Sequence, residues 1–209
     1  MSEFRRRLMM ANASRGIPCP PNGVYIMSVD GEFKTESEWV GNADNAVGIA
    51  LLTDTKKILL SLDFNTPKKW GGYGQVVPNL PQISNGADAK ADMDGSSNTD
   101  LLMADTVTTN GHPAAEYCRS YVWKANPSNI IGQGYLPSEG ELNLIYTNKS
   151  TINNCLNKLG IAPSTSYFWS STQGSSDHSW NLVWSNGVCY SDPKNYSACV
   201  WVVSALNFE

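Results

Sequence analysis

The residues of this chain that could do hydrolytic chemistry are its two histidines and the serines and aspartates near them. His178 follows the polar run Gly174-Ser175-Ser176-Asp177, so a serine, an aspartate and a histidine occur together there. A Ser-His-Asp hydrolase needs one serine that is positioned and activated as the nucleophile. The Gly-x-Ser-x-Gly turn that exposes such a serine is absent. His112 stands before Pro113, as a residue at a helix entry does. We therefore expect no catalytic residues.

A cluster of aspartates could instead bind calcium: Asp88, Asp92, Asp94 and Asp100. The loop of an EF-hand has an invariant glycine at its sixth position. With Gly95 in that position, Lys90 would be the first ligand and Leu101 the last, and neither side chain can bind a cation. We expect no metal and interpret the aspartates as turn residues, whose side chains hydrogen-bond to nearby backbone.

The cysteines are odd in number, widely spaced and without a Cys-x-x-Cys pair: Cys19, Cys118, Cys155, Cys189 and Cys199. This pattern predicts reduced, mostly buried thiols in a chain that folds in the cytoplasm. Cys189 and Cys199 would matter to a thiol oxidase, but free cysteine is among the most buried residue types, so we favour a packing role. The glycine-rich run at residues 70–74 has no lysine to complete a phosphate-binding loop. We expect no cofactor.

The composition is that of a folded soluble chain with an acidic balance. Hydrophobic residues make up 41% and charged residues 16% of the 209 residues, with a net charge of -4 and a pI near 5.2. Nucleic-acid binders usually carry clustered basic surface, and the only tight basic run here is Arg5-Arg6-Arg7. We expect no nucleic-acid partner, no membrane span and, because the apolar run after the arginines is short, no signal peptide.

Hydrophobic periodicity predicts β-hairpins first, then helices, then further strands. Residues 1–22 form an N-terminal arm with several prolines, and residues 23–209 form one domain. The first predicted hairpin has a strand at residues 23–29 and turns at Asp30-Gly31, and the second covers residues 46–64; residues 65–97 are expected to be irregular. Ser138 and Glu141 form a capping box that opens a helix. The predicted helices are 100–105, 113–121, 138–146 and 151–159, and the later strands are 167–171, 179–184, 188–190 and 200–206. The predicted class is α+β, with antiparallel sheets, two main helices and much irregular loop.

The last fifty residues are poor in charge and rich in aromatic side chains and serine. Tyr, Trp, Ser, Gly and Asn are the residues that antibody binding sites use, because rigid aromatics give contact area and small polar residues give adaptable hydrogen bonds. A β-sheet core has a similar composition. The segment therefore indicates where a binding surface would lie without deciding between the two interpretations.

Several C-terminal motifs occur in a fixed order: Tyr167-Phe168-Trp169-Ser170-Ser171-Thr172, Trp180-Asn181-Leu182, Gly187, Lys194, and residues 200–206. Upstream come Asp92-Met93-Asp94-Gly95-x-x-Asn98-Thr99 and Leu136-Pro137-Ser138-x-x-Glu141-Leu142. In order and spacing these resemble the C-type lectin-like fold of the variable proteins of diversity-generating retroelements, which are common in gut bacteria and their phages. The resemblance covers residues 23–206 and is strongest from Tyr135 onward.

The resemblance implies a rigid scaffold that displays a C-terminal variable region, about residues 167–206, whose codons are rewritten by adenine-directed mutagenesis. Trp201 stands where the family usually has arginine, and a single adenine change converts an AGG codon to TGG. Carried over position by position, the ligand-binding variable residues would be Gly174, Ser175, Ser176, Asp177, His178, Val183, Trp184, Ser185, Val188, Tyr190, Ser191, Asp192, Asn195, Tyr196, Ser197 and Trp201.

Among these residues the aromatic ones are the expected anchors, because Trp and Tyr dominate interface hot spots. We expect Tyr190, Tyr196, Trp184 and Trp201 in that role. The alternative that some of them are core residues, Trp184 first, stays open. Asp177, His178 and Asp192 would supply polar specificity.

The leading functional prediction is a non-enzymatic binding or display protein that recognises a protein or cell-surface ligand. The alternatives are a carbohydrate-binding adhesin and a formylglycine-generating-type oxidase on the same fold. Leu182 follows Trp180-Asn181 where calcium-dependent lectins have aspartate, and no Glu-Pro-Asn triplet occurs. This disfavours calcium-dependent sugar binding. The expected origin is cytoplasmic synthesis as a phage virion or prophage product, with surface display as the alternative and oligomerisation left open.

Overall fold

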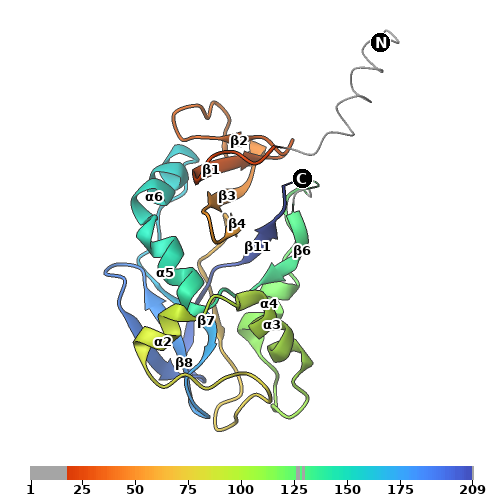
Figure 1. Ribbon diagram of the computed structural model, residues 1–209, viewed down its shortest axis with the longest axis vertical. Coiled ribbons are helices and arrows are strands. Elements are labelled where there is room, and N and C mark those ends of the chain that lie inside the picture. The colour runs from red at the N-terminus through yellow and green to blue at the C-terminus, as the bar shows by residue number, and fades with distance from the viewer. Residues whose placement is uncertain (1–17, 126–127, 129, 209) are drawn as a thin grey trace.

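The computed structural model describes residues 18–125, 128 and 130–208, which form two β-sheets flanked by helices (Figure 1). The strands of the first sheet are β1 (Gly23–Ser28), β2 (Phe33–Lys34), β3 (Ala46–Leu52), β4 (Lys57–Ser61), β6 (Ile130–Tyr135) and β11 (Val203–Leu206). The second sheet consists of β5 (Thr66–Lys69), β7 (Tyr167–Gln173), β8 (His178–Val183), β9 (Cys189–Pro193) and β10 (Ser197–Val200). Their orders are β2-β1-β3-β4-β11-β6 and β5-β10-β7-β8-β9. All strand pairs are antiparallel except β10 with β7.

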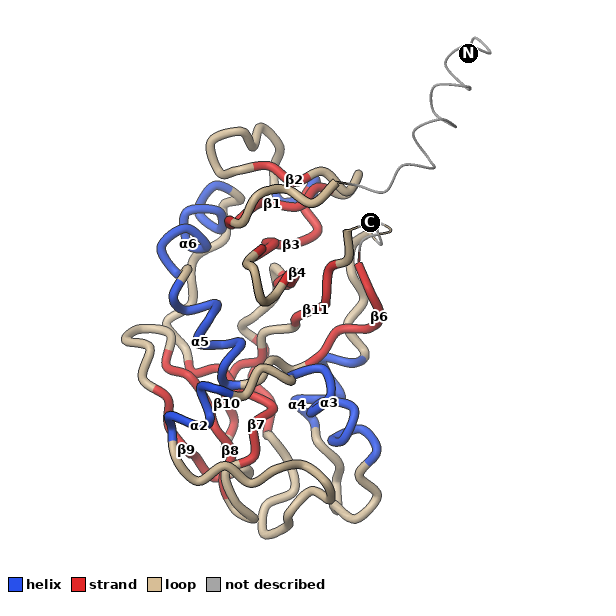
Figure 2. Tube along the Cα trace, in the orientation of Figure 1, coloured by secondary structure: helices blue, strands red, loops and turns tan. Residues whose placement is uncertain are grey.

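The helices cover both sides of the strands (Figure 2). They are α2 (Gly86–Ala91), α3 (Gly95–Ala104), α4 (Pro113–Arg119), α5 (Glu139–Thr147) and α6 (Lys149–Lys158), with a short 3-10 turn η1 (Ala43–Asn45). In Figure 2, α5 and α6 run along one side of the molecule, and α3 and α4 lie on the other. The predicted α+β class with mainly antiparallel sheets is confirmed. Among the described residues no helix is both long and apolar enough to cross a bilayer.

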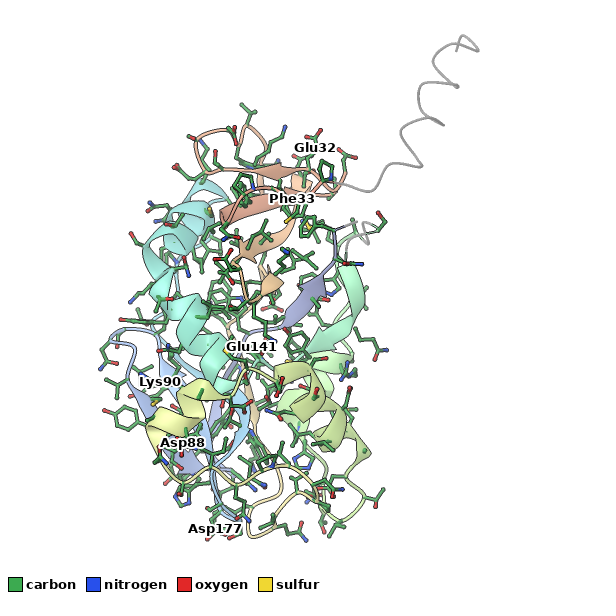
Figure 3. The ribbon with its side chains drawn as sticks, viewed as in Figure 1. Glu32, Phe33, Asp88, Lys90, Glu141 and Asp177 are labelled. Carbon is green, nitrogen blue, oxygen red and sulfur yellow. The ribbon has the colours of Figure 1, made fainter. Side chains whose placement is uncertain are left out.

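The capping box at the start of α5 is confirmed, and it fixes a buried acid. The Ser138 hydroxyl accepts from the Glu141 amide, and Glu141 Oε2 accepts from the Ser138 amide at 3.0 Å. Glu141 Oε1 also accepts from the Tyr135 hydroxyl at 3.1 Å and pairs with Lys56 Nζ at 3.0 Å. Figure 3 shows Glu141 at the junction of α5 with the strands. The acid therefore joins α5 to β6 and to the β3–β4 turn.

The main core lies between the two sheets and α5–α6, and its centre is aromatic. The Trp184 and Trp201 rings are 5.1 Å apart, and each contacts Phe168. The Trp201 ring also packs on Phe64 at 4.9 Å, and its indole N–H donates to the Ser61 carbonyl at 2.9 Å. These contacts join the last strands of the chain to the first sheet.

The two predicted hairpins are present as β1–β2 and β3–β4. Residues 65–97 are less irregular than predicted, because they contain β5, α2 and the start of α3, while β6 was not predicted at all. Residues 200–206 do not form one strand: Val200 ends β10 in the second sheet and Val203 begins β11 in the first. Of the predicted N-terminal arm, residues 1–17 lie outside the described residues, and 18–22 contain no helix or strand.

Candidate ligand-binding surface

The outer face of the second sheet carries a row of aromatic and polar side chains. Trp169 of β7 is paired with Asn181 of β8, which is paired with Tyr190 of β9. Directly paired residues project from the same face of a sheet, and residues two apart on a strand share that face. Tyr167 and Asp192 therefore lie on this face as well.

These side chains line an open depression of about 400 Å³, which we call the tyrosine groove; its lining residues are Tyr167, Trp169, Tyr190, Asp192, Tyr196, Ser197 and Ala198. Its three tyrosines are about half exposed: 50% for Tyr167, 48% for Tyr190 and 61% for Tyr196. Exposed large aromatics gathered around a hollow are typical of binding surfaces, because each gives much contact area for little conformational entropy.

The base of the groove is rigid. Trp169 is fully buried, and its indole N–H donates to the Lys68 carbonyl at 3.0 Å. The buried Asn181 donates from Nδ2 to Asp192 Oδ2 at 2.8 Å. Its other polar atom, Oδ1, is buried and has no hydrogen-bond partner within the described part of the chain. Asp192 is thus oriented from below by a side chain that itself needs a donor.

One wall of the groove is the connection from β9 to β10, which passes the β7–β8 pair. Lys194 in this connection is fully buried, and its ammonium group donates to the Gln75 carbonyl at 2.8 Å and to Gln173 Oε1 at 2.9 Å. The same nitrogen lies 4.6 Å from the centroid of the Trp70 ring. Burial lowers the pKa of Lys194 to about 8, although the Asp177 and Asp105 carboxylates act in the opposite direction. Lys194 thereby fixes the wall that carries Tyr196.

Four of the predicted ligand-binding residues lie in the tyrosine groove: Tyr190, Asp192, Tyr196 and Ser197. They come from β9, from the connection after it and from the start of β10. The sheet therefore brings together residues that the sequence separates by up to seven positions.

Of the predicted stretch, residues 174–177 form the turn between β7 and β8, and His178 is the first residue of β8. Gly174 is buried, and Ser175, Ser176, Asp177 and His178 are half-buried. The Ser175 hydroxyl accepts from the amides of Asp177 and His178, at 3.2 and 3.1 Å. The Asp177 carbonyl accepts from the Lys194 amide at 2.8 Å, so this turn supports the groove wall. Figure 3 shows Asp177 at the end of the molecule opposite Glu32.

Four further predicted residues are exposed but lie outside the groove. Ser185 and Val188 belong to the β8–β9 hairpin, which turns at Gly187 with φ of 71°. Ser191 stands between Tyr190 and Asp192 on β9, so it points to the opposite face. Asn195 lines a neighbouring depression together with Lys69 and Lys194.

Besides Gly174, three predicted contact residues are buried, and their placement on an exposed surface is wrong. Trp184 is 1% and Trp201 0% exposed, because both rings pack in the aromatic centre of the core. Val183 is also buried, at the end of β8. The open alternative for Trp184 is thus the correct one, and it extends to Trp201. Neither indole can touch a ligand.

Sequence reasoning did not select four residues of this surface: Tyr167, Trp169, Ala198 and Asn181. The alternation of Tyr167, Phe168 and Trp169 contains the signal for the first two, because Phe168 packs in the main core and its neighbours lie on the opposite face of the sheet, where Tyr167 is half exposed and Trp169 is buried. The pairing of Asn181 with Tyr190 and its bond to Asp192 depend on strand register, which local sequence does not reveal.

The only hydrogen-bonded histidine–carboxylate pair in the described residues is buried beside the Trp70 ring. His112 Nε2 contacts Asp105 Oδ2 at 2.9 Å, and the Thr108 hydroxyl donates to the same oxygen. Burial alone would raise the pKa of Asp105, but these hydrogen bonds outweigh it and lower the pKa to about 2. The remaining ring nitrogen, His112 Nδ1, meets no partner in the described chain. In the part of the chain that the structure describes, neither ring nitrogen of His112 is therefore hydrogen-bonded to a serine hydroxyl, as the base of a Ser-His-Asp hydrolase would be.

In the aspartate cluster, Asp92 accepts hydrogen bonds from other parts of the chain. Asp92 accepts from the Asp94 amide, from Asn98 Nδ2 and from the Thr172 hydroxyl, at 3.0, 2.8 and 2.7 Å. It joins α2, α3 and β7 through hydrogen bonds.

All five cysteines are free, with Cys118 and Cys155 buried and only Cys19 exposed.

Comparison with known proteins yields a fold likeness and no family. No family model matches the sequence, and no curated protein matches it. Among solved structures, a fimbrial protein from Bacteroides ovatus has a similar fold, with a TM-score of 0.59 at 15% identity. The match covers 90% of this chain and 49% of the fimbrial protein, so this chain spans about half the length of that relative. At this identity the likeness shows a shared fold alone.

Proposed function

We propose that this chain is a non-enzymatic binding module that recognises a protein or cell-surface ligand through the tyrosine groove. The observation that carries the proposal is the position of Tyr167, Tyr190 and Tyr196, about half exposed around one hollow on a rigid sheet. Buried groups hold the surroundings: Trp169 and Lys194 are bonded to backbone carbonyls. Such pre-organisation lowers the entropy lost on binding, which is where affinity is gained.

The separation of frame and surface also supports a finer proposal, that the chain is a C-type lectin-like variable protein of a diversity-generating retroelement. Tyr190, Asp192, Tyr196 and Ser197 can change without altering the core, because their side chains lie on the groove. A near-copy of the 3′ coding sequence, differing mainly at adenines and next to a reverse transcriptase gene, is the expected finding. A genome with no such copy within the gene's neighbourhood contradicts this finer proposal and leaves the binding module.

A carbohydrate-binding adhesin is the second candidate, because aromatic rings with a fixed carboxylate and amide also suit a sugar. The fold likeness to a fimbrial protein is compatible with surface display, and we propose a displayed location, on a cell or a virion, for either ligand class. Fold likeness alone does not carry a function, so the choice rests on binding measurements.

The test uses the full chain against a random-peptide display library and a panel of immobilised glycans. We expect at least one class to bind, and the combined change Tyr167→Ala, Tyr190→Ala and Tyr196→Ala to abolish that binding. Tyr73→Ala is the matched control, because Tyr73 is 54% exposed outside the groove. Absence of any binder, or binders that the triple change leaves unaffected, contradicts the proposal.

A further inference from the structure

We propose that the tyrosine groove binds a cationic side chain, an arginine or lysine of a protein partner. The inference rests on the proposed binding function and names the chemical class of its ligand. It follows from three properties of the groove: its charge, its unfilled hydrogen-bond acceptors and the faces of its tyrosine rings.

The groove is negative and contains no cation. Asp192 is the only charged residue that lines it, and neither lysine nor arginine is among its lining residues. The neighbouring depression beyond the wall has the opposite character, since Lys69 and Lys194 line it and no carboxylate does. Of the two depressions, a ligand therefore prefers the tyrosine groove only if the group that contacts the protein is positively charged.

The groove also offers acceptors that lack donors. Asn181 uses its amide nitrogen on Asp192 Oδ2, which leaves Asp192 Oδ1 without a partner among the described residues. Asn181 Oδ1 is likewise unpartnered in the described chain, but Asn181 is fully buried beneath the groove, so the free acceptor that lines the groove is on Asp192. A guanidinium group has five N–H donors in a planar fork and an ammonium group has three, so either can supply donors to a carboxylate.

The three tyrosines add electron-rich rings to the same depression. β7 and β9 are separated only by β8, so Tyr167 and Tyr190 project from strands about 10 Å apart. That spacing leaves room for one flat group between rings. A cation over a tyrosine face is attracted by the ring's electron density, and more strongly when water is excluded. No tyrosine hydroxyl of the groove is bonded within the described chain, so all three rings can adjust to the ligand.

A neutral sugar fits these properties less well. Sugar hydroxyls act as both donors and acceptors, and the groove has no charged donor for their oxygens. The one indole N–H at its base is already committed to the Lys68 carbonyl. A cation needs only acceptors and ring faces, and the groove presents both in the Asp192 carboxylate and its three tyrosine rings.

The test is a selection from a random-peptide library on the full chain, followed by synthesis of the best peptide and of forms with arginine replaced by citrulline or lysine by acetyl-lysine. We expect enrichment of arginine or lysine at one position, at least tenfold weaker binding of the neutral form, and weaker binding with added salt. Asp192→Asn should weaken binding at least tenfold. Asp30→Asn, on an exposed turn, should leave it unchanged.

The outcomes separate this inference from the binding function itself. Equal affinity of the charged and neutral peptides, or full binding by Asp192→Asn, overturns the cationic ligand. Binding of a neutral glycan or an acidic peptide that the tyrosine changes abolish overturns the cationic ligand and keeps the binding function. Absence of any groove binder in both panels overturns both.

Discussion

The ammonium nitrogen of Lys194 lies 4.6 Å from the centroid of the Trp70 ring, and this contact holds the connection that carries Tyr196. A lysine of a solvated turn would contribute little to structure. Here the side chain is buried, and its ammonium group donates to two oxygens from distant parts of the chain. One wall of the tyrosine groove is thus held by a buried charged group, and keeping that group protonated has a measurable cost in stability.

The stability of the protein should rise with pH in the range where Lys194 loses its proton. Burial lowers the pKa of Lys194 from 10.5 to about 8 in the folded chain. Between these values the unfolded chain binds the proton and the folded chain does not, so the free energy of unfolding increases with pH from about 8 to 10.5. Urea denaturation at pH 7 and pH 9.5 measures this increase.

Lys194→Met removes the titrating group. The increase in the free energy of unfolding between pH 7 and pH 9.5 should therefore be smaller in this variant than in the unchanged protein. Lys69→Met, an exposed lysine of β5, is the matched control and should keep the full gain. An identical pH dependence for Lys194→Met and the unchanged protein contradicts the buried-lysine account.

Glu139 should have the opposite pH dependence, at lower pH. Its side chain is fully buried at the start of α5, and neither carboxyl oxygen has a partner in the described chain. Burial raises the pKa of Glu139 from 4.5 to about 8, against the opposing charge of Lys90. The folded chain therefore retains a proton that the unfolded chain releases, and the free energy of unfolding falls between about pH 4.5 and 8. Glu139→Gln should remove that fall, measured by urea denaturation at pH 5 and 8. If the free energy of unfolding of Glu139→Gln still falls by the same amount between pH 5 and 8, Glu139 is not the residue responsible.

Two glutamates should differ sharply when changed to glutamine. Glu141 is buried and holds the Ser138 amide, the Tyr135 hydroxyl and Lys56. Glu32 makes one ion pair with Lys34 at the surface. Figure 3 labels both, one inside and one at the end of the molecule. Breaking a buried ion pair costs about 3–5 kcal/mol, whereas a surface pair contributes about 0–1 kcal/mol. Thermal and urea unfolding of Glu141→Gln and Glu32→Gln measure the difference; equal destabilisation would be the contrary result.

Aromatic substitutions should separate the core from the groove. Trp201→Ala removes a buried ring that contacts Phe64, Phe168 and Trp184, and should destabilise the fold by about 3–5 kcal/mol. Tyr190→Ala removes a half-exposed ring and should change stability by less than about 1 kcal/mol while reducing ligand binding. Differential scanning calorimetry of both variants tests the assignment. A Trp201→Ala chain as stable as the unchanged protein would return Trp201 to the surface.

Local chemistry was predictable from sequence wherever neighbouring residues decide the structure. The capping box of Ser138 and Glu141, the Asp30-Gly31 hairpin and the Gly187 turn depend on residues a few positions apart, and all three are present. Three residues that the composition of the C-terminal segment singled out, Tyr190, Asp192 and Tyr196, line one depression, and their role in binding stays a prediction.

The predictions that were wrong concern features that are decided by contacts between residues distant in sequence. Trp184 and Trp201 belong to the same aromatic-rich segment as Tyr190, and only the packing of Phe64 and Phe168 against them decides that they are core. Residues 200–206 are split between the two sheets because β10 pairs with β5 and β7, whereas β11 pairs with β4 and β6. β6 was missed because Gly132 and Gly134 interrupt its apolar alternation.

The most direct test of the binding surface is NMR of the full chain with isotope-labelled tyrosine, titrated with the peptide or glycan that the panels select. The account predicts that the Tyr167, Tyr190 and Tyr196 ring signals shift along one common saturation curve with a single dissociation constant, while the Tyr73 and Tyr25 signals do not move. Saturable binding that shifts Tyr73 or Tyr25 and leaves the three groove tyrosines unchanged would contradict it.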